Sequence, residues 1–474
     1  MENLKWYQIS RKKENSYKKK KVKNQTGKNR AEISIHILIS FIIGIYPLLL
    51  FEVNVGSFRI QHLILTLCTL GVLLYCFLQI RSGEWSFHFY RNRLGFAITA
   101  LTFYVFIKII YKIIITSEKN LVSYEYEMTI LALSAIFFLL LSKPEFKVYY
   151  LDTLCYSALV VFALLLMKYF CGDGAESVAT VLLKDKEGIA SYTILVCIIG
   201  IWQYLKCKDR LRSFFYISVL VIGFLVLFVN QSRISIWIMI MVFLVIPLIE
   251  RPTAELVKKD MQMFFIFLFM LCNMSLFTNY TKMFLVDIHY DIEQSVYLEL
   301  LVVIGGFFFF KYWNRIPEGV DLRRLVMRKM RRGYQFLARM TSIIFVGIIL
   351  GGNCWSNLPD SFGMAVVKGV AIPLVNEAYQ GKSAFYLCFE QFGVIGSLLV
   401  LTVCVLLITE IRKNLRLDKP ITSILVLIAS VFLVQLLFFR VSISILPVYW
   451  IFTILAVSYK EKKEKVSVSK FKFE

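Results

Sequence analysis

Residues 213–250 read SFFYISVLVIGFLVLFV, NQSR and ISIWIMIMVFLVIPLIE, two apolar runs with four polar residues between them. Each run is long enough for an α-helix to cross the hydrocarbon core of a bilayer, which needs about 17–25 apolar residues. The polar residues from Asn230 to Arg233 leave almost no room for a loop, so the second helix must turn straight back across the membrane. The stretch therefore predicts an integral membrane protein built from antiparallel α-helices.

The composition of the whole chain supports this prediction. The 474 residues are 58% hydrophobic and only 18% charged, which is more apolar surface than a soluble domain of this length could bury. A formal net charge of +22 would suggest nucleic-acid binding in a soluble protein. Here the basic residues flank apolar runs, so we expect them to set the membrane topology and expect no nucleic acid as a partner. The ten Cys residues are scattered without a CxxC pair, which argues against a metal site or a disulfide scaffold.

Apolar runs recur along the chain and predict a polytopic all-α membrane helix bundle with 12 to 14 transmembrane helices. The runs lie near residues 33–53, 60–80, 94–115, 128–142, 148–170, 189–205, 213–229, 234–250, 262–278, 295–312, 340–352, 383–408, 421–438 and 441–459. Two of them, 128–142 and 340–352, are short, which leaves the count between these limits. We expect a single transmembrane domain over residues 32–459, a disordered basic tail at 1–31 and a second basic tail at 460–474.

The distribution of positive charge supports the same topology. If the N-terminus is inside, the inner segments carry 42 of the 54 Lys and Arg residues and the outer loops carry nine. This bias is what the positive-inside rule predicts, and one missed or extra span would have reversed the pattern downstream. Both termini are therefore expected in the cytoplasm, with one larger outer loop near residues 353–382.

Three lysines lie within predicted spans, close to their outer ends. For Lys108, Lys112 and Lys168 the simpler interpretation is that each side chain extends along the helix to place its ammonium group at the outer interface. The alternative is that they line a polar cavity inside the bundle.

The predicted outer face carries two candidates for chemistry. The first is Ser232-Arg233, because an arginine at the membrane boundary is costly and is usually functional unless it fixes topology or contacts lipid headgroups. The second is the loop at 353–382, since loops of this length are usually functional or disordered and the middle of this one is too apolar for disorder. Its polar and aromatic residues include Trp355, Asp360, Lys368, Glu377 and Lys382.

The order of these features resembles a known family. A helix ending in Ser232-Arg233 precedes further spans and the large outer loop, and then comes a helix that contains Phe385 and Gly393-Val394-Ile395-Gly396, with two closing spans. Over about residues 190–459 this layout resembles the O-antigen ligase and O-antigen polymerase family of bacterial polysaccharide assembly. Ligase members commonly begin the helix after the loop with His-Asn, whereas this chain has Lys382-Ser383 there, which fits the repeat-unit polymerases better.

The resemblance implies an enzyme of the bacterial cytoplasmic membrane. It would join undecaprenyl-diphosphate-linked oligosaccharide repeat units into capsular, exopolysaccharide or O-antigen-type polymer on the outer face. Its partners would be the bilayer and the flippase and chain-length regulator of the same pathway. A polysaccharide ligase and a lipid-linked oligosaccharide flippase are the alternatives, although a flippase should carry charge deep in several helices and show two related halves.

Glycosyl transfer from a diphosphate needs positive charge to stabilise the leaving group. A guanidinium stays charged and binds phosphate oxygens bidentately, so Arg233 is the first candidate and Arg440, between the last two spans, is the second. Arg59, Lys368 and Lys382 would complete the cationic site. The other substrate contacts that we expect are Trp355 and Ser232.

The reaction also needs a base for the acceptor hydroxyl. Glu377 and Asp360 in the large loop are the candidates. The outer loop near 279–294 offers Asp287, His289, Asp291 and Glu293, but a solvated acidic loop is the simpler interpretation. No metal and no cofactor are expected, because Arg and Lys residues supply the charge.

Overall fold

The structure is a computed structural model of the chain. It describes residues 33–50, 54–55, 58–81, 93–116, 124–142, 147–171, 186–230, 233–249, 254–273, 282–283, 288–289, 292–313, 384–414, 420–438 and 445–458. The predicted basic tails, the short apolar run at 340–352 and the outer loop at 353–382 lie outside these residues.

The described part of the chain is almost entirely helical, as the sequence predicts. A first helix at 33–44 continues into the 3₁₀ helix η1 (Tyr46–Leu50). The α-helices that follow are α2 (Ile60–Arg81), α3 (Arg93–Tyr111), α4 (Glu125–Ser142), α5 (Tyr149–Cys171), α7 (Lys186–Lys206), α8 (Arg210–Val229), α9 (Arg233–Ile249), α10 (Ala254–Cys272), α12 (Ile292–Trp313), α15 (Ala384–Asn414), α16 (Pro420–Phe438) and α17 (Leu446–Ser458). A π-helical turn, η2 (Lys112–Thr116), extends α3. Two links carry antiparallel pairs of two-residue strands, β1 (Asn54–Val55) with β2 (Phe58–Arg59), and β3 (Lys282–Met283) with β4 (Ile288–His289).

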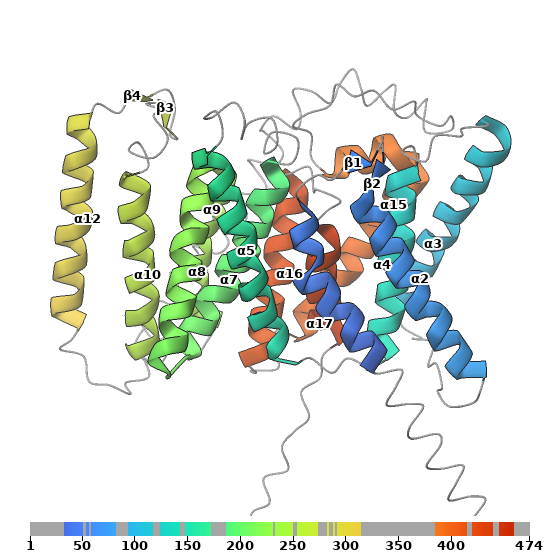
Figure 1. Cartoon of the computed structure of the whole chain (residues 1–474), viewed down its shortest axis with the longest axis horizontal. Helices are drawn as coiled ribbons and strands as arrows, with labels where there is room; N and C mark the ends of the chain where they lie inside the picture. Colours follow the sequence, from blue (N-terminus) through green and yellow to red (C-terminus); the bar gives the residue numbers. More distant parts are fainter. Residues whose placement is uncertain are drawn as a thin grey trace, which may run out of the picture.

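The helices stand side by side with α7 inside the bundle (Figure 1). Residues 188–205 of α7 are all buried, and α7 packs against α8, α5 and α9. Its contact with α8 is close because of two glycines. A Cβ atom at Gly200 would lie 3.0 Å from Leu220 Cδ2, and one at Gly223 would lie 3.0 Å from Cys197 Sγ. In a membrane, such close van der Waals packing holds helices together, because lipid tails offer no hydrophobic driving force.

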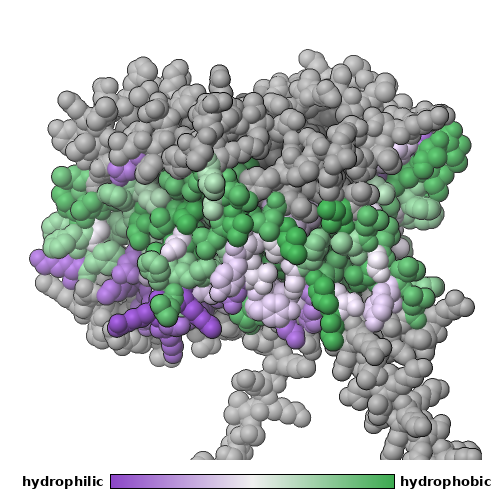
Figure 2. Space-filling view, in the orientation of Figure 1, coloured by the Kyte–Doolittle hydropathy of each residue, from purple (hydrophilic) through white to green (hydrophobic). Residues whose placement is uncertain are grey.

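The surface of the bundle is that of a membrane protein. Five described helices are long and apolar enough to cross a bilayer, and seven further apolar helices are shorter. Figure 2 shows the described hydrophobic residues forming a belt, with hydrophilic residues gathered below it. Large apolar side chains such as Phe96, Phe103 and Phe307 are more than half exposed on the helix surfaces. Lipid would solvate them at no cost, whereas water would not.

Most of the predicted spans that fall on described residues match helices to within a few residues, and the clearest exception is α10. The run predicted at 262–278 corresponds to α10, which begins eight residues earlier, at Ala254, and ends at Cys272. The helix takes in charged residues that the hydropathy pattern excludes. Lys259 forms an i,i+4 ion pair with Glu255 at 3.0 Å, and the Asp260 side chain is buried.

Candidate functional site

The residues predicted to carry chemistry fall mostly outside the described part of the chain. These are Ser232, Trp355, Asp360, Lys368, Glu377, Lys382 and Arg440. For Arg233 and Arg59 the structure describes the backbone: Arg233 begins α9, three residues after Asn230, the C-cap of α8, and Arg59 ends β2. The predicted substrate-binding and catalytic roles of all nine residues therefore stay predictions.

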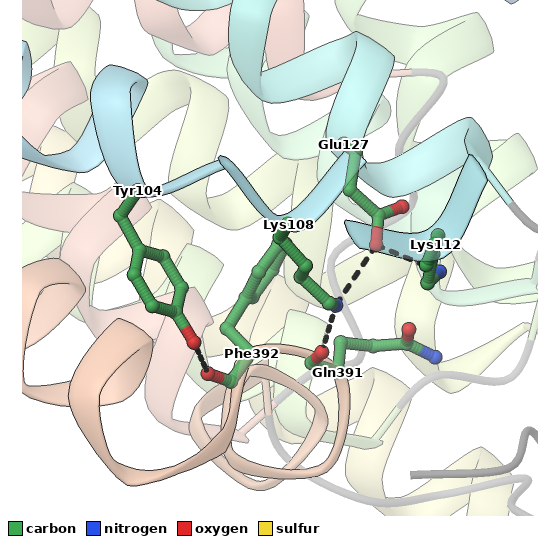
Figure 3. A network of polar contacts seen from close by, with 6 residues as sticks. All are labelled: Tyr104, Lys108, Lys112, Glu127, Gln391 and Phe392. Atoms are coloured by element: carbon green, nitrogen blue, oxygen red, sulfur yellow. Dashed lines mark hydrogen bonds and ion pairs between the residues drawn. The ribbon is translucent and has the colours of Figure 1, made fainter. Parts of the chain in front are cut away.

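The described residues bring together a different polar group, which we call the lysine cluster: Tyr104, Lys108, Lys112, Glu127, Gln391 and Phe392 (Figure 3). Lys108 comes from α3, Lys112 begins η2, and Glu127 lies in the first turn of α4. Lys108 Nζ lies 2.8 Å and Lys112 Nζ 2.9 Å from the same oxygen, Glu127 Oε1. The Glu127 side chain is completely buried, and the two lysine side chains are only 10% and 5% exposed. These three ions thus meet out of solvent, where charges interact strongly.

The cluster also contacts a break in α15. Gly393 has φ 64° and ψ −170°, so the helix is interrupted there (Figure 1). A break in an α-helix removes the N–H partners of the carbonyl groups that precede it. Two such carbonyls are satisfied from α3: Tyr104 Oη donates to the Phe392 carbonyl oxygen at 2.5 Å, and Lys108 Nζ donates to the Gln391 carbonyl oxygen. Lys108 Nζ also lies 4.7 Å from the centre of the Phe392 ring, a cation–π contact.

Two glycines make this arrangement possible. The backbone angles of Gly393 fall in a region that is essentially restricted to glycine. At Gly396 the reason is space, because an added Cβ would collide with Phe392 Cβ and would lie 2.8 Å from Tyr104 Cε1. The Gly-x-x-Gly segment on which the family resemblance partly rests is therefore the point where α15 breaks and meets α3.

The structure corrects the simpler interpretation of Lys108 and Lys112. Their ammonium groups do not extend to the outer interface but turn inward onto Glu127. Sequence reasoning missed Glu127, although one signal was available. Lys108 and Lys112 are four residues apart and so share a helix face, and Glu127 is near the start of the next apolar helix on the same predicted side. Lys168 falls among the residues whose side chains the structure does not describe.

An apolar cavity of about 170 Å³ lies next to the cluster, between α3, α4, α15, α16 and α17. Gln391 and Phe392 belong both to its lining and to the lysine cluster. The site thus combines a buried ionic group, an interrupted helix and an apolar cavity. Discontinuous helices are where many membrane proteins place the binding sites for polar or charged ligands.

A second polar group lies between α5, α7 and α8, around the half-buried Asp152. Asp152 Oδ1 accepts hydrogen bonds from Gln203 Nε2 at 2.8 Å and from Tyr216 Oη at 2.7 Å. All three residues come from continuous helices. We call these residues the aspartate cluster.

The chain matches no protein-family model, no curated protein and no solved structure. Its function therefore has to be argued from the residues and their geometry.

Proposed function

We propose that the chain is an enzyme of the bacterial cytoplasmic membrane that joins undecaprenyl-diphosphate-linked oligosaccharide repeat units into a polymer on the outer face. In this proposal the bundle has 12 to 14 spanning helices, both termini lie in the cytoplasm, and the loop at 353–382 faces outward. A flippase and a chain-length regulator of the same pathway would be its partners. The observation that carries the proposal is the break of α15 at Gly393, in the segment that resembles the polymerase and ligase family.

The direction of the described helices supports the topology. α7 ends and α8 begins at the lower end of the bundle, where α12 also ends (Figure 1). The basic residues of these ends include Lys206, Arg210 and Lys311. The hydrophilic residues in Figure 2 gather at the same end. One basic end is what the positive-inside rule expects of the cytoplasmic side.

Arg233 is the proposed contact for the diphosphate leaving group. It begins α9, and the N-terminus of a helix is the positive end of its dipole, which favours bound anions. The opposite end of the preceding helix, α8, carries Arg210 and Arg212, so residue 233 lies on the side away from those basic residues. Arg440 would assist it from the link after α16.

The break in α15 would couple this chemistry to the outer loop. The loop leads directly into the short segment of α15 before Gly393, and Tyr104 and Lys108 tie the end of that segment to α3. A substrate-binding loop needs such a rigid attachment to hold two glycan chains in line for transfer. Glu377 or Asp360 would then take the proton of the acceptor hydroxyl.

The proposal is tested by the Arg233→Ala variant in cells that make the polymer. We expect long-chain polymer to disappear while the protein still inserts at the normal level, because the diphosphate loses its charge partner. Arg212→Ala is the matched control, since Arg212 is exposed at the opposite end of α8. Polymer of normal length in Arg233→Ala would remove this arginine from the mechanism. Cysteine labelling that places residue 233 on the cytosolic side would overturn the proposal as a whole.

One observation favours a flippase as the second candidate. Lys108, Lys112 and Glu127 are buried charges within the bundle, and Asp260 of α10 is buried with no hydrogen-bond partner for either oxygen in the described part of the chain. Transporters place ionisable groups in this way along a substrate path. Proteoliposomes loaded with lipid-linked repeat units separate the two functions, because a flippase moves the lipid across the bilayer and a polymerase lengthens the glycan.

A further inference from the structure

The cavity beside the lysine cluster has the character of a site for a hydrocarbon chain. Its lining is almost entirely apolar and includes Val403, Leu407, Phe432 and Trp450. Its volume is about 170 Å³. An apolar cavity of about 150 Å³ is enough to bind benzene in a protein core. The cavity is therefore large enough to take part of an apolar ligand.

Its extent suits a chain better than a compact ring. Along the continuous part of α15 the lining runs from Val400 to Leu407, which at 1.5 Å per residue is a distance of about 10 Å, and Gln391 and Phe392 extend the lining to the break. Along α4 it runs from Tyr126 to Ser134. The hydrocarbon core of a bilayer is about 30 Å thick, or about 15 Å per leaflet, so the cavity extends over much of the depth that the chain of a lipid in one leaflet occupies.

A cation lies beside this cavity. Lys108 Nζ contacts Gln391 and Phe392, and both residues line the cavity. An ammonium group has three N–H donors, and the Glu127 carboxylate and the Gln391 carbonyl accept two of those of Lys108. A phosphate oxygen would accept the third, and Lys112 on the same carboxylate adds to the positive potential.

We propose that this cavity binds a phosphate-headed lipid. The hydrocarbon chain lies between α3, α4, α15, α16 and α17, and the head contacts Lys108 at the break in α15. An isoprenoid diphosphate and an anionic glycerophospholipid share this chemistry. The site does not depend on the proposed function, because a polymerase, a ligase and a flippase would each need to hold a lipid of this kind.

The cavity is tested by filling it in the full chain, purified in detergent. Val403 lines the cavity and is buried, whereas Val405, two residues along the same helix, is 50% exposed. We expect Val403→Phe to weaken binding of farnesyl diphosphate and of short-chain phosphatidylglycerol about tenfold or more, and Val405→Phe to leave both unchanged. If Val403→Phe does not fold, Val403→Leu fills less of the cavity and should give a smaller loss of the same sign. Equal binding by the buried and exposed variants would overturn the site.

The head contact is tested with Lys108→Gln and with inorganic pyrophosphate as a probe without a chain. We expect about tenfold weaker binding of both lipids in Lys108→Gln, and binding of pyrophosphate far weaker than that of farnesyl diphosphate. Pyrophosphate that binds as tightly as farnesyl diphosphate, or lipid binding that is unchanged in Lys108→Gln, would overturn the proposal.

Polymer synthesis is measured separately. Lipid binding without polymer synthesis would support the lipid site and contradict the proposed polymerase. Polymer synthesis by a protein whose lipid binding is unaffected by Val403→Phe would support the polymerase and contradict the lipid site.

Discussion

The lysine cluster and the aspartate cluster are both polar groups inside an apolar bundle, but they are built differently. Asp152 accepts hydrogen bonds from two neutral side chains, and the three residues lie on three uninterrupted helices. Glu127 instead holds two lysines on one oxygen, and Lys108 continues to the broken end of α15. The hydrogen bonds of the aspartate cluster serve only the Asp152 carboxylate. The lysine cluster also donates to backbone carbonyl groups at the break in α15, which would otherwise have no hydrogen-bond partner there. We therefore expect the lysine cluster, and not polar groups inside the bundle in general, to be the part of the bundle that serves function.

Among the substitutions that test this comparison, we expect Glu127→Ala to change the free energy of unfolding most. Glu127→Ala would leave two buried ammonium groups facing each other without their shared carboxylate. Removing one partner from a buried ion pair costs about 3–5 kcal/mol. The matched control is Glu255→Ala, because Glu255 also pairs with a lysine, at 3.0 Å, but is 69% exposed. We expect the control to lose no more than about 0.5 kcal/mol. Both are measured as changes in the free energy of unfolding in detergent.

A second substitution separates the cost of lost charge from the cost of lost packing. In Glu127→Gln the side chain keeps nearly the same volume but loses its charge. Because we expect the loss in Glu127→Ala to come from the missing charge, Glu127→Gln should recover little of that stability. Adding Lys112→Met to Glu127→Gln removes one of the two cations and should restore part of the stability. A Glu127→Ala variant as stable as Glu255→Ala would show that the lysine cluster is no more than a surface ion pair.

The next effect concerns the break itself. Gly393→Ala should destabilise the protein by about 1–3 kcal/mol, because its backbone angles are strained for any residue with a Cβ. The control is Gly305→Ala in α12, where an added Cβ meets no atom within 4 Å in the structure. Alanine is the better helix former by about 1 kcal/mol, so the control should lose no stability. Thermal unfolding of both variants checks this. Equal stability of the two would mean that α15 tolerates a continuous helix at residue 393.

The sequence predicted the helices well because hydropathy fixes where a chain can cross a membrane. The run predicted at 213–229 is α8 up to Val229, and the run at 421–438 is α16 from Pro420 to Phe438. The prediction was wrong where charged residues enter a helix through local pairing, as in α10. In α15, hydropathy reported one uninterrupted run, and the break depends on backbone angles at Gly393 that hydropathy does not measure.

The candidate site was less predictable than the helices. The sequence shows that Lys108 and Lys112 lie within a predicted span. Whether such a lysine turns toward lipid or toward the bundle depends on which face of its helix is packed against other helices. That face is decided by neighbours distant in the sequence, such as Gln391, which is 283 residues from Lys108. The resemblance pointed to Gly393 and Gly396, and the structure supplies the physical reason for both glycines. The predicted roles of Arg233 and the outer-loop residues rest on the sequence alone.

The smallest effects are expected from one substitution made in each cluster. Tyr216→Phe removes a hydrogen bond to the Asp152 carboxylate, and bonds to charged groups contribute about 1.5–3 kcal/mol. Because Gln203 remains bound to the same oxygen, we expect a loss near the lower limit. Tyr104→Phe removes a bond to the neutral Phe392 carbonyl, which contributes about 1 kcal/mol. Judged by stability alone, Tyr104 would therefore matter less than Tyr216.

If the chain has the proposed function, the order should reverse when polymer length is measured in cells. Tyr104 ties the short segment of α15 to α3. In the proposed function its loss should let the predicted outer loop shift and shorten the polymer, although most of the protein stays folded. Tyr216 joins helices that are continuous and far from the break, so Tyr216→Phe should leave the polymer unchanged despite its greater loss of stability. A polymer that shortens in proportion to lost stability in both variants would mean that the two clusters do the same structural work, and the distinction between them would fail.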